Sequence, residues 1–308
     1  MHSDDREFSP IMYKRLILSI IIVGLTLVAE VVGGILSNSL ALLSDAGHVF
    51  SDLVALVLSC VAYKLAAKKS DVHKSYGYRR CQVIAAFVNG LSLFVVALMI
   101  VGAAIDRFIH PLEIHWKLMS VVAVIGFIAN ILVFLIMYRK DESNINLKSA
   151  VLHIVGDLLG SLAAIVSSLM IMVSGWQVID PILSILVSVI MLRSAYQMIK
   201  TSCNILLESK PTGIDVEALR QCIMKSFSSV QDVHHMHIWA LTPSYTLMTM
   251  HVRVTDLAAL GGSEGTGLVR KLKELLHTKF DIHHVTIEVE STECSDISST
   301  DPSTVTTE

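Results

Sequence analysis

Long apolar stretches dominate the first two thirds of the chain. Each contains at least the roughly 20 predominantly apolar residues that an α-helix needs to cross a bilayer core about 30 Å thick. The stretch that opens the chain is too long for the hydrophobic part of a signal peptide, and we expect it to be retained. The pattern predicts six transmembrane helices, at roughly Tyr13–Leu36, Leu40–Ala67, Cys81–Ile109, Trp116–Tyr138, Leu147–Val173 and Val178–Leu206.

The pattern changes after Lys210 to that of a small soluble domain. Asp215 is a suitable N-cap for a helix that ends near Phe227, and alternating and apolar runs indicate strands. The predicted order is αββαβ, a helix-covered α+β domain with strands near His234–Ala240, Leu247–Val254 and His284–Glu290 and a second helix near Gly267–Phe280. The sequence thus predicts an N-terminal tail (1–12), a membrane domain (13–209), a soluble domain (210–292) and a polar, disordered tail (293–308).

Composition excludes several classes of protein. With 53% hydrophobic residues, 17% charged residues and a mean hydropathy of +0.63, the chain is too apolar for an ordinary soluble protein. It has no clustered basic patch with interleaved aromatic residues, so we expect no nucleic-acid partner. The five cysteines form no CxxC motif or small disulfide framework, and we expect reduced thiols.

Positive charges flank one side of the predicted membrane. Arg107 and Lys117 are the main basic residues on the other side. By the positive-inside rule, both termini are expected in the cytosol. The basic residues on the cytosolic side are Lys14, Arg15, Lys64, Lys68, Lys69, Lys74, Arg79, Arg80, Arg139, Lys140, Lys148, Lys200 and Lys210.

Two His-x-x-x-Asp pairs interrupt the apolar runs, one in the second predicted helix and one in the fifth. Residues four apart lie one turn apart on the same face, so His48 and Asp52 project together, as do His153 and Asp157. Counting about 1.5 Å per residue along antiparallel helices, both pairs fall near the middle of the bilayer. Together they supply four nitrogen and oxygen ligands, the number that tetrahedral zinc takes.

The ligand types favour a carrier for a divalent cation. Two carboxylates neutralise the ion, and two imidazoles favour zinc over magnesium or calcium. The imidazoles must lose their protons to bind metal, so metal and protons compete for one site. That is the minimum requirement for a metal/proton antiporter with Zn²⁺ as its substrate and protons as counter-substrate.

Alternatives remain open for Asp45 and for the function. Asp45 lies on the same stripe as His48 and Asp52, and could be a fifth ligand, an anion on the entry path or a partner that orients His48. Each His could instead simply satisfy a buried carboxylate. A membrane-embedded zinc hydrolase is the rival class, although there is no HExxH motif, and a metal sensor without transport is the third.

The chain resembles the cation diffusion facilitator family, specifically its zinc-exporting branch. The resemblance rests on Ser39-Leu40-Ala41-Leu42-Leu43-Ser44-Asp45-Ala46 with His48 and Asp52, Ser75-Tyr76-Gly77-Tyr78-Arg79-Arg80, His153 with Asp157, Asp180-Pro181-Ile182-Leu183-Ser184, and His237-Ile238-Trp239-Ala240-Leu241. It implies a Y-shaped homodimer, proton-coupled alternating access and a metallochaperone-like cytosolic domain. Cadmium, a close mimic of zinc, is expected to bind the same four ligands. Gln82 stands where the family commonly has Glu, and the fourth loop lacks a histidine cluster. The short loop favours a bacterial inner membrane, with an organelle membrane as the alternative.

The resemblance also implies metal sites outside the membrane. Carried over by position, a cytosolic site that could hold a regulatory zinc ion would use His234, His251, His283 and Glu290. Strand parity puts His251 and Glu290 on the face opposite the core, with His234 and His283 on the apolar side unless a bulge re-aims them. A loop site involving Asp71 and His73 matches the family pattern only in part, and a solvated loop is the simpler interpretation.

Overall fold

The computed structural model describes residues 10–66, 74–137, 144–255 and 263–291; within these, the side chains of 10–13, 59–60, 62–66, 137, 144–157 and 263–266 are not described. The chain divides into two compact units, Met1–Lys200 and Thr201–Glu308. Each unit is considered by itself.

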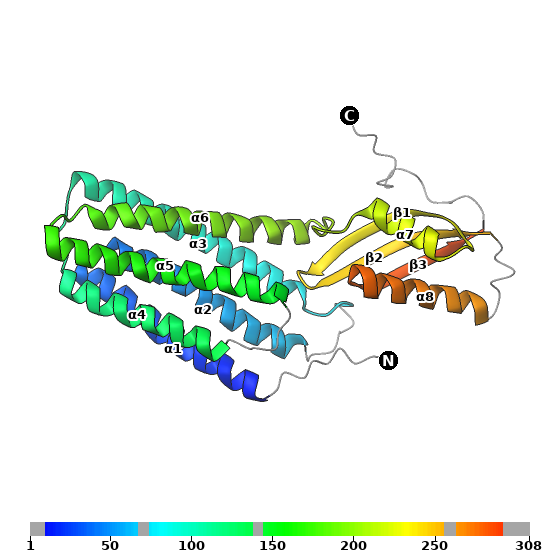
Figure 1. Ribbon diagram of the computed structural model, residues 1–308, viewed down its shortest axis with the longest axis horizontal. Helices are drawn as coiled ribbons and strands as arrows, with labels where there is room; N and C mark the ends of the chain where they lie inside the picture. The colour runs from blue at the N-terminus through cyan, green and yellow to red at the C-terminus, as the bar shows by residue number, and fades with distance from the viewer. Residues whose placement is uncertain (1–9, 67–73, 138–143, 256–262, 292–308) are drawn as a thin grey trace. The chain divides into compact units, whose positions relative to one another are not determined.

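The first unit is a bundle of long helices (Figure 1). In chain order they are α1 (Pro10–Ser37), α2 (Leu40–Ala66), α3 (Arg80–Ile109), α4 (Trp116–Met137), α5 (Asn144–Ser174) and α6 (Ile179–Leu206), the last of which runs on into the second unit. Five of them are long and apolar enough to span a bilayer, and the part of α5 with described side chains adds the shorter apolar segment Leu158–Ser174. The six predicted helices are therefore present. The first and fifth begin a few residues earlier than the apolar runs because the helices continue beyond the apolar core.

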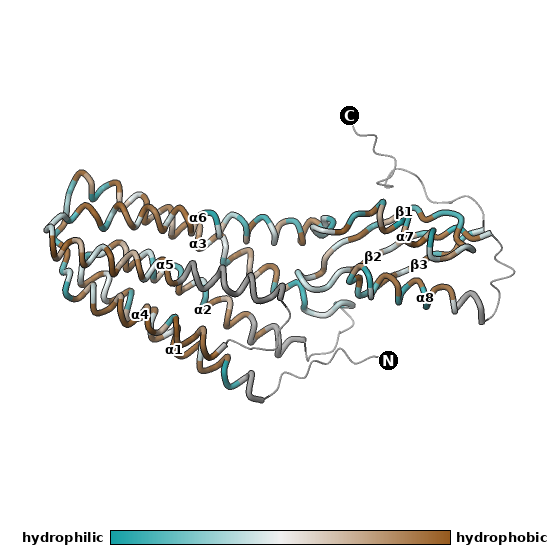
Figure 2. Tube along the Cα trace, in the orientation of Figure 1, coloured by the Kyte–Doolittle hydropathy of each residue, from teal (hydrophilic) through white to brown (hydrophobic). Residues whose placement is uncertain are grey.

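The helices of this bundle are mostly hydrophobic along their length (Figure 2), and many of their exposed side chains are apolar while several polar ones are buried. Leu25 on α1 is 68% exposed and Val173 on α5 is 81% exposed. Serines and carboxylic acids are instead fully buried, among them Ser39, Asp45 and Ser161. This inversion of the usual soluble pattern is what a bilayer as solvent requires, so the unit is a multi-pass membrane domain.

The second unit is a small α+β domain with the predicted αββαβ order. It contains α7 (Val216–Ser226), β1 (Val230–Thr242), β2 (Tyr245–Val254), α8 (Ser263–Phe280) and β3 (Ile282–Glu290). The sheet order is β1-β2-β3, with β1 antiparallel and β3 parallel to β2, so α8 is the crossover between the parallel pair. Both helices contribute to one apolar core with the sheet, through residues such as Leu219, Ile223, Leu272, Leu276, Met250 and Val252.

Candidate metal sites

The first of the two membrane pairs lies on α2. His48 Nδ1 is 3.4 Å from Asp52 Oδ2, and the two side chains are 13% and 16% exposed. The helix continues through both residues without a break, so the one-turn spacing alone brings the imidazole to the carboxylate. An imidazole and a carboxylate held this close, and mostly out of solvent, can offer two ligand atoms to one cation.

The second pair belongs to α5, where His153 and Asp157 are one helical turn apart. Their side chains fall outside the described set. The next turn of α5 packs directly against α2, because Ser161 Oγ donates a 2.6 Å hydrogen bond to Asp45 Oδ2. The helices that carry the two pairs are therefore in contact within one turn of both pairs.

Asp45 lies in this contact between α2 and α5. Its side chain is fully buried, and a Cβ on Gly160 would collide with its Oδ1. The hydrogen bond from Ser161 holds one oxygen of the carboxylate toward α5, a contact that none of the three alternatives for Asp45 included. Sequence reasoning did not single out Ser161, although its position four residues after Asp157, on the same helical face, was a usable signal.

A second buried carboxylate closes the end of the bundle opposite the predicted cytosolic side. Asp180 on α6 accepts hydrogen bonds from Ser39 Oγ and the Leu40 backbone N–H, both at 2.7 Å, and from the Ala41 backbone N–H at 3.3 Å. Arg107 Nη1 on α3 lies 3.7 Å from Asp180 Oδ2 and also donates to the Asn38 carbonyl. Asp180 therefore caps the first turn of α2 and ties α3 and α6 to it.

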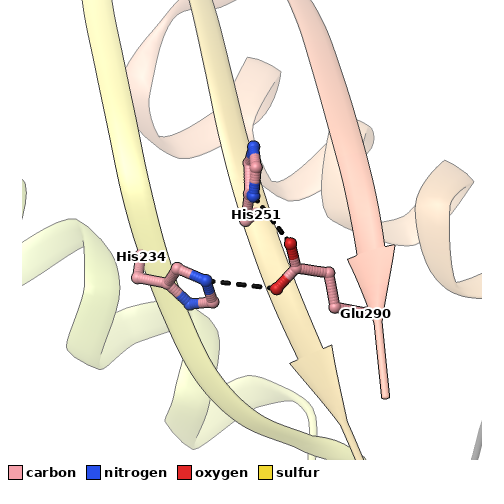
Figure 3. A group of neighbouring side chains, drawn as sticks. All are labelled: His234, His251 and Glu290. Carbon is pink, nitrogen blue, oxygen red and sulfur yellow. Dashed lines mark hydrogen bonds and ion pairs between the residues drawn. The ribbon is translucent and has the colours of Figure 1, made fainter. Parts of the chain in front are cut away.

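The α+β domain contains a compact group of three potential ligands, His234 on β1, His251 on β2 and Glu290 on β3 (Figure 3). One ligand atom from each lies within 4.8 Å of the others. His251 Nδ1 is 2.8 Å from Glu290 Oε1, and His234 Nε2 is 3.2 Å from Glu290 Oε2 in an ion-pair contact without hydrogen-bond alignment. The side chains are 10–18% exposed, which leaves them accessible to an ion.

An irregularity in β1 explains how His234 joins this group. The pairing of β1 with β2 shifts between His234 and His237, and His235 has a φ of 49°, in the left-handed region. Strict alternation would have put His234 on the apolar side. The bulge re-aims it toward His251, with their ring centroids 5.7 Å apart.

His283 does not join the other three predicted ligands. It lies near the start of β3, seven residues before Glu290, and its ring packs against Tyr245 and His277 at 5.0 Å and 5.7 Å. The length of β3 therefore separates His283 from the group at the other end. The loop residues Asp71 and His73 lie outside the residues that the structure describes.

An ion pair between Asp232 on β1 and Arg220 on α7 lies beside the three-residue group. Asp232 Oδ2 is 3.4 Å from His234 Nδ1, and Asp232 Oδ1 accepts a 2.7 Å hydrogen bond from Arg220 on α7. Burial alone would raise the pKa of Asp232, but the hydrogen bond and charge of Arg220 outweigh it and lower that pKa below its ordinary value. Asp232 is thus held ionised and tied to α7.

Comparison with known proteins agrees with this architecture. Residues 16–207 match the cation efflux transmembrane domain, and residues 211–292 match the cytoplasmic domain of cation efflux proteins. The chain belongs to the cation efflux family.

Individual members of the cation efflux family match over nearly the whole chain. The zinc transporter ZitB of Pectobacterium atrosepticum is 40% identical over 284 residues, covering 92% of this chain and 87% of its own. A cadmium, cobalt and zinc/H⁺-K⁺ antiporter of Bacillus velezensis is 39% identical, covering 90% and 88%. The metal cation efflux system protein CzcD of Cupriavidus metallidurans is 36% identical, covering 91% and 87%. These relatives are transporters, which favours the carrier over the hydrolase or the sensor.

Proposed function

We propose that this cation efflux protein exports Zn²⁺ from the cytosol in exchange for protons. His48, Asp52, His153 and Asp157 are the proposed ligands. The observation that carries the proposal is the contact between α2 and α5 one turn from both His-x-x-x-Asp pairs, made by Ser161 and Asp45. Two antiparallel helices in such a contact can present four ligands to one ion.

The ligand set accounts for the substrate. Two carboxylates balance a doubly charged ion, and two neutral imidazoles favour zinc over ions that prefer oxygen alone. The names of the relatives, which specify zinc, cadmium and cobalt, support this class of substrate. Cadmium, a softer ion of the same charge, is the expected second substrate.

The proposed transport cycle uses the same four residues for both substrates. In an inward-open state, cytosolic zinc displaces protons from the histidines and carboxylates. The helices then rearrange so that the site faces the other side, where zinc leaves and protons bind. Competition at one site couples the two fluxes without a separate proton pathway.

We further propose that the protein works as a homodimer in a bacterial inner membrane with both termini in the cytosol. Most basic residues near the ends of the helices lie on the same side of the predicted spans as the termini, which supports this orientation. The match to the family's cytoplasmic domain supports the dimer. In this orientation His234, His251 and Glu290 face cytosolic zinc, and we propose that they bind a regulatory ion.

Transport in proteoliposomes tests the membrane site. With the lumen acidic, the proposal predicts zinc uptake that collapses when a protonophore removes the pH gradient. Asp52→Ala and Asp157→Ala should each reduce uptake to the level of empty liposomes, because either change removes a ligand. Asp106→Asn, which alters a carboxylate with 72% exposure at the end of α3, is the matched control and should transport normally. Full activity in either alanine variant would refute the proposed site.

Metal counting tests the cytosolic site. Glu290→Gln should remove one bound zinc ion per protomer while the ion at the membrane site remains. The control is Glu274→Gln on α8, because Glu274 is exposed and lies outside the three-residue group. An unchanged zinc count in the Glu290 variant would contradict the assignment.

A further inference from the structure

A third carboxylate is buried in the membrane domain and has no role in the proposed transport site. Glu30 on α1 is fully buried, and neither of its oxygens has a hydrogen-bond partner among the described residues. An ionised carboxylate in such surroundings is costly unless a cation accompanies it; without a cation the group takes up a proton.

The Glu30 carboxylate points across the bundle toward α4 and α5. A Cβ on Gly126 of α4 would collide with Glu30 Oε1 and would lie 3.8 Å from Ser161 Oγ of α5. The absence of a side chain at Gly126 therefore makes the space that the carboxylate occupies. Glu30 and Ser161 thus both lie next to Gly126.

Ser161 connects this point to Asp45. Its hydroxyl donates to Asp45 Oδ2 at 2.6 Å and accepts a 3.4 Å hydrogen bond from Asn130 Nδ2 on α4. Four helices thus contribute oxygen-bearing side chains to one buried cluster, which consists of Glu30, Asp45, Asn130 and Ser161.

The cluster lies one turn away from the transport site, on the side away from the cytosol. Asp45 precedes His48 by three residues on α2, which runs inward, and Ser161 follows Asp157 by four residues on α5, which runs outward. In the proposed orientation, an ion that leaves the four ligands outward meets this cluster next.

We propose that Glu30, Asp45, Asn130 and Ser161 form a second intramembrane binding site for the transported divalent cation, on its release path. This inference rests on the proposed function for the direction of travel. The site takes the ion with oxygen ligands only, whereas the transport site has two imidazoles. Zinc prefers imidazole, so the second site binds it more weakly and passes it outward.

Manganese binding tests the site, because Mn²⁺ accepts an all-oxygen shell and its electron paramagnetic resonance reports nitrogen ligands. The full-length protein would carry His48→Ala, His153→Ala, His234→Ala and His251→Ala, which removes the imidazoles of both proposed zinc sites. We expect one Mn²⁺ per protomer without nitrogen coupling. Adding Glu30→Gln should weaken binding at least tenfold, and it should weaken binding more than adding Asp52→Asn does.

Two glycine variants test the space around the Glu30 carboxylate without changing its charge. Gly126→Ala fills the space that Glu30 occupies and should weaken Mn²⁺ binding, whereas Gly102→Ala on α3, where a Cβ meets nothing within 4 Å, should leave it unchanged. Size-exclusion profiles and melting temperatures within 2 °C of the parent would show that each variant is folded.

Two outcomes would overturn the inference: Mn²⁺ binding that depends on Asp52 and not on Glu30, or binding that neither change weakens. The proposed function fails separately, because it requires zinc flux in the unmodified protein. If the unmodified protein transports no zinc but Mn²⁺ binding still depends on Glu30, the second binding site is supported and its place on a release path is refuted.

Discussion

At the scale of single residues, Asp180 shows how a buried charge can organise helix ends. It accepts hydrogen bonds from one hydroxyl and two backbone N–H groups at the start of α2, and Arg107 lies beside it. The first backbone N–H groups of a helix have no partner within the helix, so the carboxylate satisfies groups that would otherwise be orphaned. The conformation at the start of α2 therefore depends on a residue about 140 positions away in the sequence.

Removing the Asp180 carboxylate should lower the free energy of unfolding. Asp180→Ala leaves Arg107 and the N-terminus of α2 without their buried partner, and we expect a loss of about 3–5 kcal/mol in the free energy of unfolding. Thermal unfolding of the purified protein in detergent measures the effect. Asp106→Ala, at an exposed carboxylate in the last turns of α3, serves as the control. A melting temperature for Asp180→Ala equal to that of the control would contradict the capping role.

The lowered pKa of Asp232 predicts that the stability of the α+β domain depends on pH. Its pKa is lowered below its ordinary value of 3.8, with Arg220 overcoming the effect of burial. A carboxylate with a depressed pKa stabilises the folded state above its ordinary pKa, and this stabilisation is lost as the pH falls through the folded-state value. Wild type should therefore be more stable than Asp232→Asn at pH 7, and the difference should shrink below about pH 4.

Urea unfolding at several pH values, with a chelator present to remove metal effects, measures this difference. Glu217→Gln is a suitable comparison, because Glu217 also lies near Arg220, at 3.7 Å, but has a 60% exposed side chain. A stability difference for Asp232→Asn that stayed constant from pH 7 to pH 3 would show that the ion pair is not its source.

Residue spacing predicted some site residues better than others. His48 and Asp52 could be identified because helical pitch alone brings them together, and the structure places them 3.4 Å apart. The same spacing puts Ser161 on the face of Asp157 but does not identify its partner Asp45, and it gives no signal for the space that Gly126 leaves to Glu30. Serine and glycine are common in membrane helices, and the role of each depends on which neighbouring helix faces it.

At the scale of secondary-structure elements, the cytosolic helix α7 follows the sequence signals closely. Asp215 has extended backbone angles, and its side chain accepts hydrogen bonds from the backbone N–H groups of Glu217 and Ala218. The predicted N-cap is confirmed. A helix end carries such a local signal where the capping side chain comes from a neighbouring residue, as it does here.

The cap also gives a stability prediction. Asp215→Ala should destabilise the cytosolic domain by about 1 kcal/mol, because two backbone donors lose their acceptor, while Asp215→Asn should retain most of the stability. Chemical unfolding monitored by circular dichroism measures both variants. Equal losses for Ala and Asn would indicate that the cap does not act through its side-chain oxygen.

Strand β1 shows where local pattern fails. Alternation predicts the side of each residue only while the pairing register is constant, and the register shifts between His234 and His237. The positive φ of His235 has no signature in the sequence, since histidine adopts it only occasionally. The bulge is nevertheless what brings His234 to His251 and Glu290.

At the scale of the whole molecule, the class of protein follows from hydropathy and the function from the contents of the bundle. Six apolar runs and an αββαβ domain could be predicted because membrane spans and strand-helix alternation leave strong, repeated signals. The contacts between helices could not, because they depend on small residues and single polar groups in an apolar background. Membership of the cation efflux family agrees with both the class of protein predicted from hydropathy and the function inferred from the bundle.

The central claim is that four residues from two membrane helices hold one divalent cation. X-ray absorption at the zinc edge, on protein with His234→Ala to remove the cytosolic site, tests it most directly. The account predicts one high-affinity zinc ion per protomer with about four nitrogen and oxygen neighbours, two of them imidazole, near 2.0 Å. Adding His153→Ala should remove one imidazole and weaken binding. An unchanged zinc environment in that variant, or a parent protein with no tightly bound zinc, would contradict the account.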